Sequence, residues 1–212
     1  MRIQTFVFNP FFENTYIVTD DTREAVIIDP GCYEDYEKQE LVSYIGENKL
    51  KPVAIWNTHC HIDHVLGNAY CARHFNIPLL VPEGEKPVLD SVPAYSSNYG
   101  FQQYEIAEVN EWIPNKGILS FGTTQLDILY APGHSLGHLM FLERKTNQLI
   151  AGDVIFRESI GRTDLPGGDY ATLERSIREQ VYTLQEDVVI YPGHGPTTTV
   201  GHEAIHNPFV RK

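Results

Sequence analysis

The sequence predicts an α/β (α+β) fold in which two β-sheets pack face to face and helices cover their outer sides. Short runs rich in Val, Ile and Leu recur along the chain between turn residues, which is typical of buried strands. Segments with helical periodicity lie between these runs. Because strands and helices alternate in two similar halves, the pattern indicates two packed sheets with helices outside.

Several predicted strands end at a His or Asp residue. The runs 24–31, 52–61, 125–134, 148–153 and 187–194 lead, in this order, to Asp29, to His59 and His61, to His134, to Asp153 and to His194. Strand ends are rigid while the adjoining loops can vary, so metal-binding and catalytic groups often gather there. Three more runs, 1–8, 14–19 and 138–143, are predicted to form antiparallel strands and hairpins.

Helices are predicted between the strands. The segment 169–185 places four apolar residues on one face: Leu173, Ile177, Val181 and Leu184. Asp169 is its predicted N-cap. We also expect helices at 34–48 and 67–75. The interval 83–117 contains several Pro and Gly residues, so we expect an irregular loop there that covers a site.

Composition restricts the class of protein. A chain of 212 residues suffices for one sizeable core, and no linker divides it, so we expect one domain spanning 1–212. The net charge of −12, from 16 basic and 28 acidic residues, argues against a nucleic-acid partner. No apolar run approaches the ~20 residues of a membrane span, so no membrane partner is expected.

Cysteine usage and the N-terminal segment indicate a cytoplasmic protein. The three cysteines, Cys32, Cys60 and Cys71, are odd in number and have no C-x-x-C spacing, which suits a reducing compartment. The first residues alternate apolar and polar side chains, as in a strand, and contain no signal-peptide pattern. The oligomeric state is left open.

The stretch 56–64, "WNTHCHIDH", crowds metal-binding side chains into one turn. In an extended turn, His59 and His61 point to the same side and can bind one ion, whereas Asp63 and His64 follow a change of direction and can bind a second ion. His134 and His194 would complete the two sets, and Asp153, with two carboxylate oxygens, could bridge both ions. Paired divalent ions can lower the pKa of a water that they share, so that hydroxide is available near neutral pH.

The remaining imidazoles and the intervening thiol are expected to be structural. This group consists of Cys60, His74, His138, His202 and His206.

Four motifs together resemble the metallo-β-lactamase-fold hydrolases. They are "THCHIDH", "APGHSLGH", "GDVIFRESIGRTDLPGGD" and "YPGHGPTTTVGHEAIHNPF", they occur in the right order, and they cover nearly the whole chain. The resemblance is closest to the glyoxalase II (hydroxyacylglutathione hydrolase) branch, in the compact form without a C-terminal helical domain. It implies a four-layer αββα sandwich with two mixed sheets flanked by helices.

The resemblance also implies roles for individual residues. One metal would be held by His59, His61 and His134, and the other by Asp63, His64 and His194, with Asp153 bridging. Asp29 would steady the ligands without binding metal. The catalytic residues would be Asp63 and Asp153, with Asp63 helping to orient the hydroxide. A His/Asp site accepts two divalent ions, most readily Zn, with Fe or Mn as alternatives.

Within this family, thioester hydrolysis is the expected reaction, with a small molecule such as S-lactoylglutathione as substrate. Common di-zinc β-lactamases carry Cys in place of Asp153, which argues against a β-lactam. Persulfide dioxygenases share "GRTD" and "GGD" but end in P-A-H-D-Y, whereas this chain reads "YPGHG" at 191–195. A mononuclear iron persulfide dioxygenase, a hydrolase of another small ester and a non-catalytic binding protein are the alternatives.

We expect substrate contacts to come from local groups, because the resemblance is to the compact form without the family's glutathione-binding helical domain. The candidates are Arg162, Tyr95, Tyr99 and Phe101. Each has a structural alternative, since Arg162 could form an internal ion pair and the aromatic rings could simply pack. If Arg162 binds an anionic group, its loss should mainly raise KM.

Overall fold

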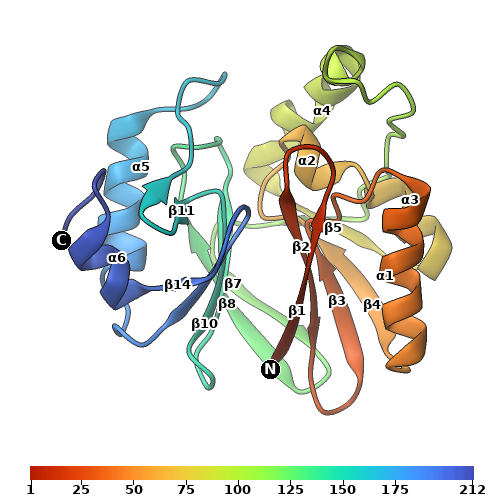
Figure 1. The fold of residues 1–212 in the computed structure, drawn as a ribbon, viewed down its shortest axis with the longest axis horizontal. Helices are drawn as coiled ribbons and strands as arrows, with labels where there is room; N and C mark the ends of the chain where they lie inside the picture. Colours follow the sequence, from red (N-terminus) through yellow and green to blue (C-terminus); the bar gives the residue numbers. More distant parts are fainter.

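The computed structural model describes all residues, 1–212, and contains two six-stranded sheets that face each other (Figure 1). Helices lie on the outer side of each sheet, so the molecule has four layers. This arrangement confirms the predicted α/β fold with two mixed sheets flanked by helices. None of the helices combines the length and the apolar composition that a membrane span requires.

The N-terminal sheet has the order β1-β2-β3-β4-β5-β6. Its strands are β1 (Arg2–Phe8), β2 (Glu13–Thr19), β3 (Glu24–Ile28), β4 (Lys51–Trp56), β5 (Leu79–Pro82) and β6 (Glu111–Ile113). The first three strands are antiparallel, and the pairs from β3 to β6 are parallel. Parallel neighbours need crossover connections, which the helices on this side supply.

The C-terminal sheet has the order β14-β13-β10-β9-β8-β7. Its strands are β7 (Gly117–Phe121), β8 (Thr124–Tyr130), β9 (Leu139–Glu143), β10 (Gln148–Gly152), β13 (Val189–Pro192) and β14 (Thr198–Thr199). Only the β10–β13 pair is parallel. A separate hairpin of β11 (Ile155–Phe156) and β12 (Ser159–Ile160) projects beside this sheet.

Three buried clusters correspond to the spaces between the four layers. Consecutive residues on β2 separate two of them, since Ile17 faces the helix side and Val18 faces the other sheet. Trp56 of the first sheet meets Phe141 of the second in the central layer, with ring centroids 5.7 Å apart. This period-2 alternation on strands covered on both faces explains why the strand runs are almost wholly apolar.

The helices complete the outer layers. On the N-terminal side these are α1 (Asp35–Glu47), α2 (Ile62–Val65) and α3 (Asn68–Phe75), and on the C-terminal side α5 (Tyr170–Ser176) and α6 (Val200–His206). Asp169 caps α5 by accepting a hydrogen bond from the Thr172 amide, as predicted. The helix predicted over 169–185 ends early, because a π-helical turn (Ile177–Val181) follows α5 directly. Strand β5 and helix α6 had no clear sequence signal.

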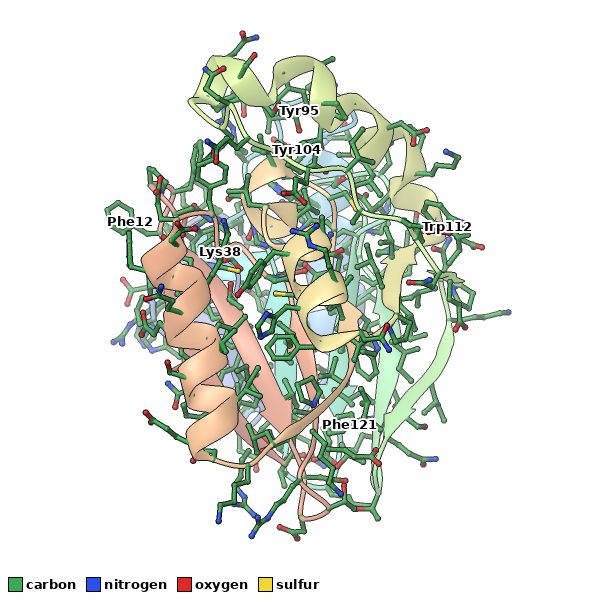
Figure 2. All side chains as sticks on the ribbon, turned by 90° about the vertical axis from the view of Figure 1, so that its right-hand side faces the viewer. Phe12, Lys38, Tyr95, Tyr104, Trp112 and Phe121 are labelled. Atoms are coloured by element: carbon green, nitrogen blue, oxygen red, sulfur yellow. The ribbon has the colours of Figure 1, made fainter.

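The prediction of an irregular loop over 83–117 is wrong for most of that interval. It contains a 3-10 turn (Glu83–Glu85), helix α4 (Lys86–Tyr95), a second 3-10 turn (Ser96–Tyr99) and β6. Pro87 is compatible with the helix because a first-turn amide needs no intrahelical partner. Residues 100–110 and 114–116 lack regular structure, and Figure 2 shows Tyr104 of the first of these segments at the same end of the molecule as Tyr95 of α4.

Candidate metal centre

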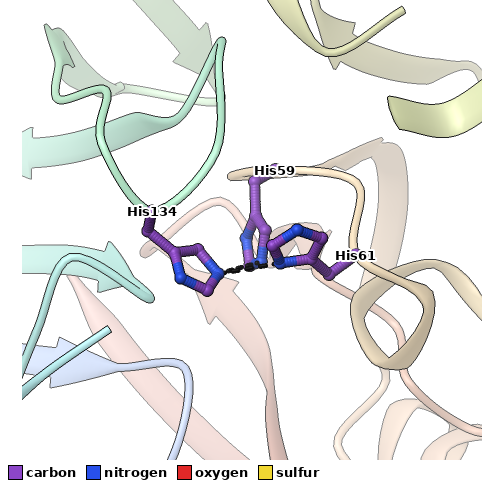
Figure 3. Close-up of side chains that lie close together, drawn as sticks. All are labelled: His59, His61 and His134. Atoms are coloured by element: carbon purple, nitrogen blue, oxygen red, sulfur yellow. Dashed lines mark hydrogen bonds between the residues drawn. The ribbon is translucent and has the colours of Figure 1, made fainter. Parts of the chain in front are cut away.

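Three histidines from two loops converge at one end of the facing sheets (Figure 3). His59 and His61 follow β4 of the N-terminal sheet, and His134 follows β8 of the C-terminal sheet. The Nδ1 atom of His61 lies 2.8 Å from Nε2 of His134, which in turn lies 3.3 Å from Nε2 of His59. These nitrogens are close enough together to be ligands of a single ion.

A second group lies beside the first. Asp63 and His64 are in α2, and His194 follows β13 from the opposite sheet. Nε2 of His194 is 3.2 Å from Oδ2 of Asp63, which is 3.6 Å from Nε2 of His64. The short helix α2 changes the chain direction after His61, so the two halves of the motif face different groups.

Asp153 lies between the two groups, directly after β10. Its Oδ2 atom is 3.5 Å from Nε2 of His134 in the first group and 3.5 Å from Nε2 of His194 in the second. Its Oδ1 atom is 3.5 Å from Nε2 of His64. The carboxylate therefore faces ligand atoms of both groups.

Two orphaned atoms indicate that this donor set fits metal ions. Nε2 of His64 and Oδ1 of Asp153 are buried and have no hydrogen-bond partner within the protein. Buried polar atoms without a partner are costly, whereas neutral imidazole and carboxylate are ordinary ligands of divalent metals. The residues present therefore suit the metal ions that the sequence implied.

Hydrogen bonds orient several imidazoles by holding the nitrogen that faces away from the centre. Nδ1 of His134 is 2.8 Å from the carbonyl oxygen of Arg162, and Nδ1 of His194 is 3.0 Å from that of Phe11. Since a carbonyl can only accept, both Nδ1 atoms carry a proton, and Nε2 is therefore the nitrogen through which each ring can bind a metal ion.

Asp29 contacts the imidazole of His64. Its Oδ2 atom is 3.2 Å from Nδ1 of His64 and accepts a hydrogen bond from the Thr58 hydroxyl at 2.6 Å. Its Oδ1 atom accepts the Thr58 amide at 2.7 Å. Asp29 thus contacts both the loop that carries His59 and the imidazole of His64.

The acids and imidazoles of the centre shift each other's pKa values. Burial and the neighbouring His134 lower the pKa of His61 to about 3. Burial also lowers the pKa of His194, but hydrogen bonds to Asp153 and Asp63 outweigh this effect and raise the pKa to about 9. Burial raises the pKa of Asp153, yet His64 and His194 hold it well below its usual range. Metal binding at His194 must therefore displace a proton.

The residues expected to be structural lie outside the ligand groups. Cys60 is buried in the outer N-terminal core, and His138 is buried with Nε2 accepting the Asp153 amide at 3.0 Å. The His138 ring also stacks on His59, with centroids 4.7 Å apart. His74 stacks on Tyr70, away from the centre.

Residues distant in sequence support the last histidine loop, and sequence reasoning missed them. The Asn14 side chain donates to the carbonyls of Pro192 and Gly195 at 2.9 and 2.8 Å, and the Tyr16 hydroxyl donates to the Pro192 carbonyl at 2.5 Å. These contacts join residues about 180 positions apart, so no local pattern signals them. Glu85, a buried acid at the start of α4, was missed for the same reason.

A cavity of about 930 Å³ opens over both ligand groups. Besides the ligands, its lining includes residues of α4 and of the loop before α5: Pro87, Val88, Ser91, Tyr95, Leu165 and Pro166. Most of the other lining side chains are apolar, as is usual for small-molecule sites. Arg162 is the only Lys or Arg side chain among them.

Three of the four expected substrate residues line this cavity: Tyr95, Tyr99 and Arg162. The guanidinium of Arg162 makes a two-pronged ion pair with Asp164, with both hydrogen bonds at 2.7 Å, and remains exposed. The prediction that Phe101 contacts substrate is wrong. Its side chain is 3% exposed, packs on Tyr33 and does not line the cavity. The turn after α4 directs its ring into the outer core rather than into the cavity.

Comparisons with known proteins agree with this geometry. The family model described as the metallo-beta-lactamase superfamily matches residues 8–194. The chain is 35% identical to hydroxyacylglutathione hydrolase GloC of Haemophilus influenzae, covering 99% of this chain and 98% of that protein.

Two solved structures resemble the whole molecule. The crystal structure of BLEG-1 B3 metallo-beta-lactamase is 34% identical, with a TM-score of 0.91 over 100% of both chains. That of TTHA1623 in a di-iron-bound form is 32% identical, with a TM-score of 0.86 over 99% of this chain and 100% of the other. The chain belongs to the metallo-β-lactamase superfamily, whose members are generally metal-dependent hydrolases.

Proposed function

We propose that this protein is a dinuclear metal-dependent thioester hydrolase that acts on S-lactoylglutathione or a similar small thioester. The observation that carries the proposal is the position of Asp153, whose Oδ2 atom lies at the same 3.5 Å distance from His134 and from His194. The likeness to GloC, a hydroxyacylglutathione hydrolase by name, supports the substrate class. The protein's partner would then be a small molecule.

In this proposal each of the two ligand groups binds one metal ion. His59, His61 and His134 would hold one ion, Asp63, His64 and His194 would hold the other, and the Asp153 carboxylate would contribute to both. Bound divalent ions would supply a water of lowered pKa and a positive charge for the oxygen of the attacked carbonyl. We expect zinc, although iron and manganese are also compatible with imidazole and carboxylate ligands. The di-iron-bound form of TTHA1623 supports iron as an alternative.

The chain's own residues would orient both reactants. The Asp63 carboxylate, 3.2 Å from His194 and lining the cavity, is placed to accept a hydrogen bond from the attacking water. Thiolate is a good leaving group, so the reaction needs no dedicated general acid. Tyr95 and Tyr99 would contact the thiol portion of the substrate, and Arg162 would attract one of its carboxylates.

The test is hydrolysis of S-lactoylglutathione by the metal-loaded protein, followed as loss of thioester absorbance. The Asp153→Ala variant, assayed in parallel with its metal content measured, separates turnover by this centre from background hydrolysis. Turnover by the wild type alone supports the proposal. Wild-type protein that holds two metal equivalents but leaves this and other small thioesters intact would exclude thioester hydrolysis.

A second candidate is β-lactam hydrolysis, which the likeness to BLEG-1 favours. The sequence argued against a β-lactam substrate because Asp153 stands where common di-zinc β-lactamases carry Cys. The likeness to BLEG-1 weakens that argument, because this 34% identical protein is described as a B3 metallo-beta-lactamase. A chromogenic cephalosporin in the same assay distinguishes the two reactions. Oxygen uptake with a glutathione persulfide tests the dioxygenase alternative.

A further inference from the structure

Glu85 is a fully buried carboxylate with no basic partner. It ends the 3-10 turn Glu83–Glu85 that joins β5 to α4, and its exposed fraction is 0%. None of the ion pairs in the structure involves it. A buried acid is retained at such a position only if hydrogen bonds satisfy its oxygens.

The donors to Glu85 come from the two loops that carry the three-histidine group. Oε2 accepts the backbone amide of Cys60, the residue between His59 and His61, at 2.9 Å. Oε1 accepts the Ser135 hydroxyl and the Gly137 amide, both at 2.6 Å. One carboxylate therefore connects the loop after β4 of one sheet to the loop after β8 of the other.

The backbone around Glu85 is built for this close approach. Gly84 and Gly137 face each other, and a Cβ atom added to Gly84 would lie 2.7 Å from the Cα atom of Gly137. Only residues without side chains allow the two backbones to come this near. The carboxylate thereby reaches both loops directly.

We propose that Glu85 is a positioning residue that sets the distance between His61 and His134 and so determines how tightly the three-histidine group binds its ion. The two nitrogens are 2.8 Å apart, and metal sites tolerate ligand displacements of only about 0.2 Å. The inference rests on the proposed metal centre but not on the identity of the substrate.

Glu85→Gln is the informative substitution because it keeps the size and removes one acceptor. If the amide oxygen stays at Oε1, its NH₂ group faces the Cys60 amide; if the side chain flips, its NH₂ group faces the Gly137 amide. Either orientation opposes two donors and pushes one histidine loop away. Outer residues that orient ligands change metal affinity by about 10- to 100-fold.

Cobalt titration of the metal-free protein measures this effect without any enzyme assay. We expect two bound equivalents in the wild type. In Glu85→Gln we expect one of them to bind about 10- to 100-fold more weakly, with an altered visible absorption spectrum. Glu83→Gln, an exposed acid in the same turn, controls for the charge change.

Glu143→Gln controls for loss of stability. Glu143 is a buried acid that accepts the Lys145 and Thr146 amides at 3.0 and 2.7 Å, at the far end of β9 from the centre. It should lower the melting temperature and leave cobalt affinity and spectrum unchanged. If Glu85→Gln does not fold, Ser135→Ala removes one of the three donors and should weaken the same equivalent several-fold.

Two results would overturn the inference. One is Glu85→Gln, or Ser135→Ala in its place, with wild-type cobalt affinity and spectrum. The other is an equal loss of affinity in Glu143→Gln. Failure of the wild type to bind two equivalents would instead count against the dinuclear centre itself.

Discussion

Replacing Gly137 by alanine should separate the two histidine loops by a distance that the structure defines. Gly137 lies between His134 and His138, and its backbone touches the chain at Gly84 and Glu85. An added Cβ atom would lie 2.4 Å from the carbonyl carbon of Gly84 and 2.6 Å from the amide nitrogen of Glu85. Both contacts are with backbone, so no side-chain rotation can relieve them.

The size of the displacement follows from these contacts. Ordinary Cβ contacts begin near 3.4 Å, so the two backbones must separate by about 1 Å. A shift of that size exceeds the tolerance of metal ligation and typically costs about 10²-fold in rate when it reaches reacting groups. Overpacking of this kind also destabilises a fold by about 1–3 kcal/mol.

The assay for Gly137→Ala combines three measurements: metal equivalents by elemental analysis, kcat on the best substrate, and thermal unfolding. We expect one of two equivalents to be lost on dialysis, kcat to fall about 100-fold, and the melting temperature to fall by several degrees.

Gly46→Ala is the matched control. Gly46 lies in α1, and an added Cβ atom would meet nothing within 4 Å. Alanine there should raise stability by about 0.5–1 kcal/mol and leave metal content and kcat unchanged. A Gly137→Ala protein with both metals, full kcat and unchanged stability would refute the reasoning, because it would mean that the loops can separate without disturbing the ligands.

Three more substitutions test other features. Asp153→Ala should lower kcat at least 10³-fold and metal content from two equivalents towards one, with the fold retained by circular dichroism, because its Oδ2 atom lies 3.5 Å from a histidine nitrogen of each group; near-normal turnover would exclude a dinuclear mechanism. Arg162→Ala should raise KM for a carboxylate-bearing substrate about 10-fold with little change in kcat, whereas a purely structural ion pair with Asp164 would alter neither constant. Asp20→Asn should lower unfolding stability at pH 7 by about 1–2 kcal/mol. Burial raises the pKa of Asp20, but hydrogen bonds from Thr22 and Thr123 outweigh this and lower it to about 2, so this stability is present above pH 4 and is lost as pH falls towards 2. Denaturant melts from pH 7 to pH 2 should therefore converge for the two proteins, and parallel curves would contradict the assignment.

The strands and the ligand motif could be predicted because their signals are local. Apolar runs bounded by turns identified most strands, and His59 and His61 gain their shared direction from a spacing of two residues in extended chain. The capping role of Asp169 likewise depends only on residues within one helical turn. Such features can be predicted from sequence because no distant contact is needed to form them.

The segment after β5 could not be predicted for the opposite reason. Its Pro and Gly residues read as a loop, yet α4 forms there because Val92 is buried against the N-terminal core. The same packing turns Phe101 away from the cavity that contains Tyr95 and Tyr99. Tertiary burial outweighs weak local propensity over segments this short.

The sequence by itself determined the arrangement of two facing sheets with helices outside and the residue types of the candidate metal centre, since both follow from periodicity and spacing along the chain. Only the tertiary structure decided which oxygens and nitrogens meet: that Oδ2 of Asp153 is the atom near both His134 and His194, and that Glu85 connects two loops from opposite sheets. These contacts depend on how the two sheets pack, and packing energy is shared among many residues far apart in the chain. No short stretch of sequence can therefore encode the distance between His61 and His134, although the chemistry of the centre depends on it.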